Sequence, residues 1–255
     1  MPQKQSITLK KSLDILELFE KNELPLNVKE LSQQIGLPES TVYRYISTLI
    51  QKDFIEYDPS FQKYRLGMKL IRLGYAATRQ MEIHRIAYPI MEDLALKSEE
   101  TILLTLKKGN SAIVVEVVES SRGGIKLAMN RGDTLPLYSC ALARPLMAYL
   151  PDEEIDSVLQ ANPPKRFTEH TITNVQEIKS QLKKIRRQGY AYSDQEVTIG
   201  ARGLGSPVFN YSGAVIATLC LAGSLHHITK PKIPQFLKLL LKATEECSLK
   251  MGFKP

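Results

Sequence analysis

Residues 26–54, LNVKELSQQIGLPESTVYRYISTLIQKDF, contain two short segments of helical periodicity joined by a glycine and a proline. Asn27 followed by Glu30 is a capping-box pattern, which predicts that a helix begins here. Gly36 can take the left-handed backbone conformation that ends such a helix. Pro38 suits the first position of a second helix, where no backbone N–H is needed. The stretch therefore predicts two short helices around a glycine turn.

The second predicted helix has an apolar side, which we expect to be buried, and a polar side. Its apolar side consists of Val42, Tyr45, Ile46 and Leu49. Hydroxyl groups on the polar side and its flanks can hold phosphates, and an arginine can bond the O6 and N7 atoms of a guanine. The helix therefore has the chemistry of a reader in the major groove of DNA. The DNA contacts that we expect from it are Ser40, Thr41, Tyr43, Arg44, Ser47 and Thr48.

A predicted β-hairpin follows directly after the second helix. Residues 54–58 alternate like a strand, a proline and a serine mark the turn, and residues 63–66 return as a second strand. Such a hairpin is the wing of a winged helix-turn-helix, and Lys63 and Arg65 would lie along the DNA backbone. The two helices alone leave open a small helical hairpin with a solvated polar face. The wing favours DNA binding.

The composition is that of a soluble globular protein whose charge suits a polyanionic partner. The chain has 255 residues and a formal net charge of +7, and 43% of its residues are hydrophobic. It has no apolar run of about 20 residues, as a membrane span requires, and no apolar signal-peptide core. We therefore expect a cytoplasmic protein with no membrane contact. Cys140, Cys220 and Cys247 lack metal or disulfide spacing, so we expect reduced thiols and no metal.

Two more helices are predicted around the winged unit. Residues 6–20 form one helix, with Ser6 in a position to cap it. Residues 68–81 form another that is apolar over a wide arc, which predicts a linker helix and part of a dimer contact. The apolar residues of the two helices are Ile7, Leu9, Leu13, Leu16 and Phe19 in the first, and Leu70, Ile71, Leu73, Tyr75 and Ala76 in the second.

The pattern changes from Ile83 onward to a mixture of helices and strands. Short turns between the strands favour antiparallel neighbours. The prediction is an α+β fold with a DNA-binding domain at 1–67, a linker helix at 68–81 and a second domain at 82–255. That domain should hold about five or six mainly antiparallel strands flanked by helices. We expect helices at 83–98, 139–150, 174–188 and 233–251, and strands at 101–106, 112–118, 125–129, 203–210 and 214–222.

Several sequence blocks, in order along essentially the whole chain, resemble one protein family. The N-terminal blocks are SLDILELF (12–19), ELSQQIGLPESTVYRYISTL (30–49) and YRLG (64–67). The C-terminal blocks are GDTLPLYSCALARPLMAYL (132–150), QGYAYSDQE (188–196) and GLGSPVFNYSGAVIATLCLAGS (203–224). By these blocks the chain resembles the IclR-type bacterial transcriptional regulators.

The resemblance implies a winged-helix reader, a linker helix and a GAF-like domain that binds a small organic acid. It implies a ligand-responsive regulator of a catabolic operon, and of the two directions we expect a repressor. The partners would be a palindromic operator in double-stranded DNA, a small carboxylate effector, and a second copy in a homodimer or in a tetramer of two dimers. A small hydrolase tethered to a winged helix is the alternative, and the lack of a nucleophile–base constellation disfavours it. No cofactor is expected.

The resemblance also places an effector pocket between the sheet and the helix expected from Ser139. The family's acidic position falls on Ser193 or on Asp194. Leu142 stands where the family commonly has a small residue, so we expect a smaller or reshaped pocket. The effector contacts that the resemblance implies are Leu127, Leu135, Ala141, Leu142, Asp194, Cys220 and Ala222.

Physical chemistry gives an independent argument for the same pocket. A helix that begins at Ser139 would point unpaired N–H groups and the positive end of its dipole into the cavity, which favours a carboxylate. The alternative is that Ser139 only caps the helix and that the apolar residues nearby are packed core. The sequence leaves both interpretations open.

Overall fold

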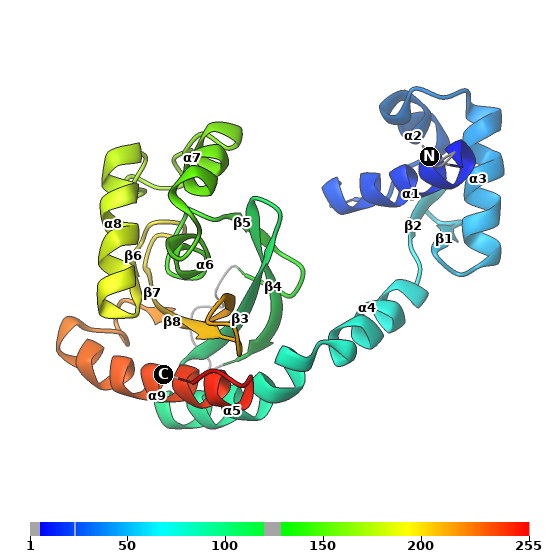
Figure 1. Ribbon diagram of the computed structural model, residues 1–255. Helices are drawn as coiled ribbons and strands as arrows, with labels where there is room; N and C mark the ends of the chain where they lie inside the picture. Colours follow the sequence, from blue (N-terminus) through cyan, green and yellow to red (C-terminus); the bar gives the residue numbers. More distant parts are fainter. Residues whose placement is uncertain (1–5, 23, 120–128, 255) are drawn as a thin grey trace. The chain divides into compact units, whose positions relative to one another are not determined.

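The computed structural model describes residues 6–22, 24–119 and 129–254, and the chain divides into two compact units (Figure 1). The first unit ends at Thr78 and the second begins at Arg79. No helix of the described residues is long and apolar enough to cross a membrane.

The first unit is a winged helix-turn-helix. Helices α1 (Ile7–Lys21), α2 (Val28–Ile35) and α3 (Glu39–Gln51) share one core, and β1 (Ile55–Asp58) pairs antiparallel with β2 (Lys63–Leu66). The two helices, the turn and the wing are therefore confirmed. Helix α4 (Lys69–Gln80) follows the wing.

The turn between α2 and α3 depends on a capping box and a left-handed glycine. The backbone N–H of Glu30 donates to Asn27 Oδ1 at 2.9 Å, and the backbone N–H of Asn27 donates to Glu30 Oε2 at 2.7 Å. Gly36 has a φ of 68°, a conformation that disfavours residues with a Cβ. Pro38 is the residue before α3 rather than its first residue, one position from the prediction.

The core of the first unit confirms the apolar side predicted for α3, because Val42, Tyr45, Ile46 and Leu49 are all buried. The apolar stripe predicted for α1 is wrong at its N-terminal end. Ile7, Leu9 and Leu13 are 75%, 61% and 50% exposed, whereas Ile15 and Phe19 are buried. Ile15 and Phe19 are four residues apart and so lie on one side of α1, which is the buried side. Leu9 and Leu13 point away from that side, and Ile7 lies at the first position of the helix, beyond the end of the core.

The second unit contains a six-stranded sheet in the order β5-β4-β3-β8-β7-β6, with every neighbouring pair antiparallel. This confirms the predicted α+β class. Strands β5 and β6 were not predicted, because three or four residues are too few to show a clear alternation. The strand expected at 125–129 falls mostly outside the described residues, and Met129 is in no strand. The strands are β3 (Thr101–Lys108), β4 (Ser111–Val118), β5 (Thr134–Pro136), β6 (Ala191–Asp194), β7 (Ala201–Phe209) and β8 (Val215–Ser224).

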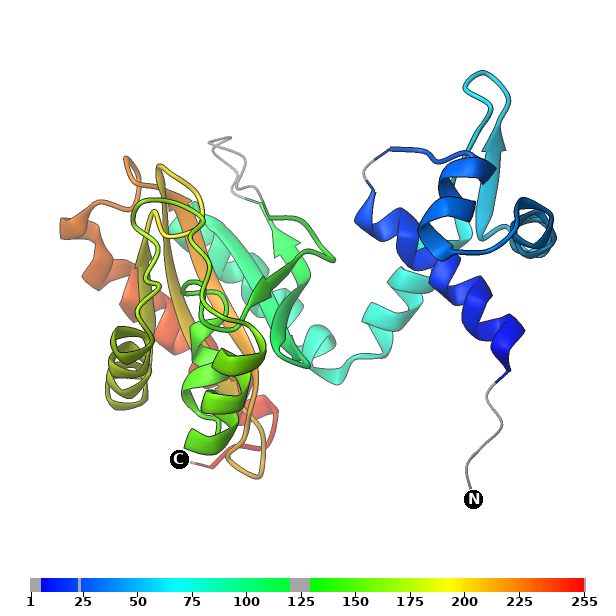
Figure 2. The same ribbon diagram turned by 90° about the horizontal axis from the view of Figure 1, so that it is seen from above.

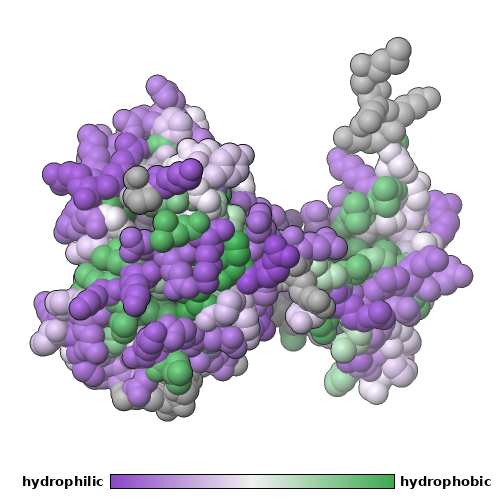
Figure 3. Space-filling model, turned by 60° about the horizontal axis from the view of Figure 1, so that its bottom comes forward, coloured by the Kyte–Doolittle hydropathy of each residue, from purple (hydrophilic) through white to green (hydrophobic). Residues whose placement is uncertain are grey.

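Helices cover both faces of this sheet (Figures 1 and 2). Helices α5 and α9 lie on one face, and α6, α7 and α8 lie on the other. Figure 3 brings the α5 and α9 side of this unit forward, where hydrophilic residues predominate and hydrophobic ones lie between them. The helices are α5 (Glu82–Ser98), α6 (Arg144–Ala148), α7 (Asp152–Ala161), α8 (Val175–Gln188) and α9 (Ile233–Lys250), with a short 3-10 helix at Lys230–Lys232.

The alternation of side chains along β3 divides them between two separate cores. Ile102 and Leu104 pack with the residues of α5 and α9, whereas Leu103 packs with the opposite layer. On the neighbouring strand β8, Cys220 belongs to the same layer as Leu103. Successive residues of a strand point to opposite faces, so each central strand contributes to both cores.

Glu100, in the turn between α5 and β3, is a buried carboxyl group. Its Oε1 lies 3.7 Å from Nδ1 of His227, and its other oxygen occupies the space beside Gly223, where a Cβ would lie 2.0 Å away. Burial raises the pKa of Glu100 from 4.5 to about 7, and the charge of Lys232 offsets part of the rise.

Stability should therefore fall as the pH rises through the window from 4.5 to about 7. In this window the folded protein binds more protons than the unfolded chain, because the folded-state pKa of Glu100 is the higher one. Glu100→Gln should flatten this part of the profile and stabilise the protein at pH 8 by about 1–3 kcal/mol. Urea unfolding of both proteins across this range measures the effect, and a variant with the wild-type pH profile would contradict it.

Candidate functional site

The outward side of α3 carries a single cation among hydroxyl groups. That cation is Arg44, which is exposed. Four of the predicted contacts around it are also exposed, namely Ser40, Tyr43, Ser47 and Thr48, and Thr41 is half-buried. The Ser47 and Thr48 hydroxyls donate to the Arg44 carbonyl at 2.9 and 3.2 Å, so they are held against the helix. The Arg44 guanidinium lies 5.6 Å from the centre of the Tyr45 ring. The six residues predicted on this helix thus lie together on its outward side and flanks.

The two cations of the wing have carboxylate partners within the same unit. Lys63 Nζ lies 3.5 Å from Glu30 Oε1, and Arg65 Nη2 lies 3.2 Å from Glu56 Oε2. Exposed ion pairs of this kind contribute at most about 1 kcal/mol, so a phosphate can compete for either cation. The wing is therefore less positive in the free protein than its sequence alone indicates.

Tyr64 anchors the wing in the core of the first unit. Its backbone N–H donates to the Leu26 carbonyl at 2.7 Å, and the Leu26 N–H donates back at 3.0 Å. Burial, together with a hydrogen bond to Tyr43, raises the pKa of Tyr64 to about 12, so its phenol stays neutral. The hydrogen bond to Tyr43 connects the wing directly to α3.

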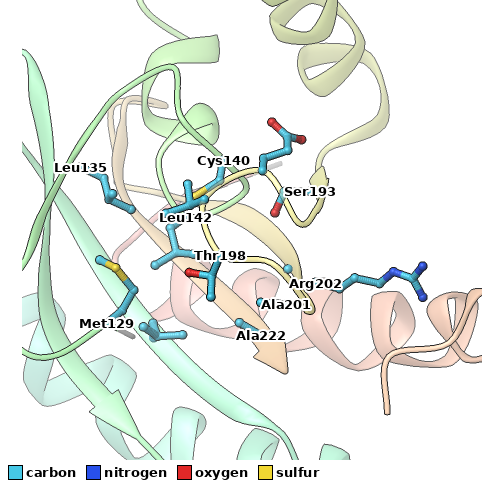
Figure 4. Close-up of a pocket in the computed structure, with 13 residues that line it drawn as sticks. Met129, Leu135, Cys140, Leu142, Ser193, Thr198, Ala201, Arg202 and Ala222 are labelled. Atoms are coloured by element: carbon cyan, nitrogen blue, oxygen red, sulfur yellow. The ribbon is translucent and has the colours of Figure 1, made fainter. Parts of the chain in front are cut away.

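The second unit contains a small, partly open cavity of about 50 Å³ on the α6 side of the sheet (Figure 4). This is several times the roughly 10–15 Å³ that one water molecule needs. In Figure 4 the Arg202 guanidinium points away from the other labelled side chains. We call this space the effector cavity. Its lining is largely apolar and consists of Leu103, Met129, Leu135, Cys140, Leu142, Ser193, Glu196, Val197, Thr198, Ala201, Arg202, Gly203 and Ala222.

Three of the predicted effector contacts, Leu135, Leu142 and Ala222, line this cavity together. Ala141 and Cys220 are fully buried next to lining residues but do not line it themselves. Leu127 lies outside the described residues. Burial raises the pKa of the Cys140 and Cys220 thiols, so both are neutral.

The structure distinguishes the two residues, Ser193 and Asp194, on which the family's acidic position could fall. Ser193 lines the effector cavity, and Asp194 does not. The Asp194 carboxylate lies 3.0 Å from Nη2 of Arg202 and accepts a hydrogen bond from the Tyr192 hydroxyl at 3.0 Å. Burial alone would raise its pKa, but these bonds outweigh burial and hold the pKa of Asp194 below its ordinary value.

The carboxylate that does line the cavity belongs to Glu196, which sequence reasoning missed. Its oxygens bond both terminal nitrogens of Arg144, one of them at 3.0 Å. Arg144 is only 1% exposed, and its Nε donates to the Tyr138 carbonyl at 2.8 Å. Burial raises the pKa of Glu196, and the bonds from Arg144 offset part of the rise. The available signal was Glu196 itself, at the end of the QGYAYSDQE block.

The helix predicted from Ser139 is wrong, because α6 begins only at Arg144. Pro145 has no N–H to give the carbonyl four residues earlier, so it fits the first turn of a helix but not its interior. Ser139 and the residues after it form turns, in which the N–H of Ala143 bonds the Cys140 carbonyl at 3.1 Å. The argument from a helix dipole at Ser139 therefore fails.

Two glycines of β7 let this turn segment lie directly on the sheet. A Cβ on Gly205 would come within 1.9 Å of the Ala141 carbonyl oxygen, so only glycine fits there. A Cβ on Gly203 would lie 3.1 Å from the Ser193 hydroxyl. In the part of the chain that the structure describes, the backbone N–H groups of Cys140 and Ala141 have no acceptor. Buried donors of this kind need an acceptor, and a bound anion would supply one.

Removing one member of the buried ion pair should destabilise the second unit strongly. Arg144→Met leaves the Glu196 carboxylate buried without its cation, at a cost of about 3–5 kcal/mol. The double variant Arg144→Met with Glu196→Leu removes both charges and should recover part of that loss. Urea unfolding of the wild type, the single variant and the double variant measures these differences in stability. Equal stability of the single and double variants would show that the two charges do not depend on each other.

The fold and the two sites define a class of protein: a winged-helix DNA-binding unit in one chain with an α+β ligand-binding unit. Comparison with known proteins agrees. The family description "IclR helix-turn-helix domain" matches residues 8–59, and "Bacterial transcriptional regulator IclR C-terminal" matches residues 75–249. The chain therefore belongs to the IclR family of DNA-binding transcriptional regulators with an effector-binding domain. Members of this family are regulators, so the chain is not an enzyme.

Several relatives are similar over nearly the whole chain. The regulator KipR of Bacillus subtilis is 29% identical over 251 residues, which cover 98% of this chain and 99% of KipR. The transcriptional repressor AllR of Salmonella typhi is 24% identical over 253 residues, covering 99% of this chain and 93% of AllR. The crystal structure of the Thermotoga maritima IclR has a TM-score of 0.77 and 31% identity, and the match covers 96% of this chain and 99% of that one.

Proposed function

We propose that this regulator is a repressor of a catabolic operon and that a small organic acid controls it. The observation that carries the proposal is the exposed polar side of α3, with Arg44 as its one cation. The name of AllR, a repressor, supports repression. Access to DNA supports a cytoplasmic protein that associates with the nucleoid when bound. We propose residues 1–67 as the DNA-binding domain, 68–81 as the linker and 82–255 as the effector-binding domain.

Arg44 would read a base, and the other polar residues would hold phosphates. An arginine on the outward side of a recognition helix can bond O6 and N7 of one guanine. The hydroxyl groups near it are short and reach the DNA backbone more readily than the bases. Lys63 and Arg65 would add phosphate contacts from the wing once phosphates replace their carboxylate partners.

We further propose that the protein binds a palindromic operator as a homodimer, or as a tetramer of two such dimers. Exposed apolar side chains in the first unit support this proposal. Ile71 of α4 is 64% exposed and Ile7 of α1 is 75% exposed, and burying such residues against a second copy is favourable. One recognition helix reads only a few base pairs, so two copies on two half-sites give a longer site.

Arg44→Ala should weaken binding to the selected operator by about 1–3 kcal/mol and relax the preference at one base pair in each half-site. Operators selected from random duplexes, followed by binding assays with each base substituted in turn, measure both effects. Lys10→Ala is the matched control, because it removes one exposed cation from α1 of the same unit.

The full palindrome should bind far more tightly than a duplex with a single half-site, since only the palindrome engages two copies. Unchanged base preference in Arg44→Ala would show that α3 is not the reading helix. Equal affinity for the palindrome and the half-site would contradict the dimer.

We propose that the effector's carboxylate binds the free backbone N–H group of Cys140, which lines the effector cavity. Its body would lie against Leu135, Leu142 and Ala222, which line the effector cavity. A cavity of about 50 Å³ is far below the roughly 300 Å³ at which ordinary ligand sites begin. The proposed effector is therefore a very small acid, and Leu142 is one of the residues that limit its size.

Leu142→Ala should widen the effector cavity and admit larger acids. Wild-type protein should bind pyruvate in preference to benzoate, whereas the variant should gain about tenfold or more in affinity for benzoate. Isothermal titration calorimetry with the full-length protein measures both affinities. Leu142→Met is the control, because it keeps the volume of the side chain and should leave the preference unchanged. Benzoate binding equally well to wild type and Leu142→Ala would show that Leu142 does not limit the site.

A further inference from the structure

A second cavity lies beside α8, with a volume of about 300 Å³. Its walls come from α8, from the segment just before α8, from β6, and from the Arg144–Glu196 ion pair. It is six times larger than the effector cavity, and hydrogen-bonding side chains make up most of its lining. We call it the α8 cavity. Glu196 lines both cavities, so the ion pair forms part of the wall between them.

The charged side chains that line the α8 cavity are two cations and two carboxylates, and Lys184 is the one of them without an ion-pair partner among the described residues, because Arg202, which does not line the cavity, pairs with Asp194. Glu196 is paired with Arg144, and Asp194 is paired with Arg202 at 3.0 Å. Lys184 of α8 also lines the cavity, and no carboxylate of the described residues lies within ion-pair distance of it. An unpaired cation at the mouth of a cavity favours an anionic ligand.

One neutral polar group of the α8 cavity is left with a free hydrogen-bond acceptor. The Tyr192 hydroxyl is already engaged, because it donates to Asp194 and is also hydrogen-bonded to Arg202. The amide nitrogen of Gln188 donates to the Tyr190 carbonyl at 2.7 Å, which leaves the amide oxygen of Gln188 to accept. An acceptor of this kind is matched by a hydroxyl group on a ligand.

We propose that the α8 cavity binds a small hydroxylated anion, as a second ligand distinct from the effector. Its negative charge would lie at Lys184, and a hydroxyl group would donate to the amide oxygen of Gln188. Ile172 and Ile185 give the carbon skeleton an apolar surface. The volume of about 300 Å³ is at the lower end of ordinary ligand sites. Binding at this site does not require an acid in the effector cavity, so the two proposals can be tested independently.

Calorimetry of the full-length protein with D-gluconate and with glycerol 3-phosphate tests the site. Both probes are hydroxylated anions, one a carboxylate and the other a phosphate monoester, and the tighter binder identifies the preferred anionic group. Sorbitol, which has the hydroxyl groups without the charge, should not bind. Binding of neither anion at millimolar concentration would overturn the proposal.

Lys184→Gln should weaken binding of the better probe by about tenfold or more, because a charge-assisted hydrogen bond is lost. Gln181→Glu, at a half-buried lining position of α8, adds a negative charge to the lining and should abolish binding. Lys183→Gln is the matched control, since Lys183 is exposed on the same helix and does not line the cavity. Equal affinity in Lys184→Gln and Lys183→Gln would overturn the site.

The variant Leu142→Ala distinguishes ligand binding in the α8 cavity from ligand binding in the effector cavity. Leu142 lines only the effector cavity, so this variant should keep wild-type affinity for the hydroxylated anion while its response to pyruvate and benzoate changes. Loss of gluconate or glycerol 3-phosphate binding in Leu142→Ala would place these probes in the effector cavity and overturn the proposal.

Discussion

The guanidinium of Arg144 holds together the turn segment on which the effector cavity depends. It bonds the carbonyls of Tyr138 and Ser139 within the segment, and it bonds the carboxylate of Glu196, which lines the effector cavity. A charge this deeply buried is tolerated only when its partners satisfy it, so the turn segment cannot separate from Glu196 without leaving both charges unpaired. The missing side chain at Gly205 then allows the segment to lie against β7.

The DNA-binding unit balances its charges differently. Its wing cations are paired with Glu30 and Glu56 on the surface, where each pair contributes little and can be exchanged. Arg44, by contrast, has no carboxylate partner within ion-pair distance among the described residues. Exposed lysines elsewhere in the unit, such as Lys10, Lys29 and Lys52, also lack an ion-pair partner among the described residues. Arg44 therefore differs from the wing cations in being free of a carboxylate before DNA binds.

Local sequence signals predicted the elements that depend on neighbouring residues. The capping box of Asn27 and Glu30, the glycine turn and the wing each involve residues close in the chain, so their chemistry is visible in the sequence. The effector cavity depends instead on residues far apart. Arg144 and Glu196 are 52 positions apart, and no periodicity connects them. The start of α6 was also missed, although Pro145 marked it, because the apolar pattern before Arg144 continues without a break.

The exposed start of α1 was missed for a related reason. Ile7, Leu9 and Leu13 are apolar, but only the packed fold shows that the core ends before them. The choice between Ser193 and Asp194 likewise needed the strand. The two residues are adjacent, so they point to opposite faces of β6, and only the position of the sheet shows which face meets the effector cavity.

Strand β3 is a rigid connection between the two layers that cover the sheet. Leu103 is part of the wall of the effector cavity, while Ile102 and Leu104 on either side of it pack against the layer that contains α5. A protein interior is as closely packed as a crystal, so a strand cannot move at Leu103 and stay in place at its neighbours. A ligand that displaced Leu103 would therefore also shift the contacts of β3 with α5, the helix that continues the chain from α4 through Met81.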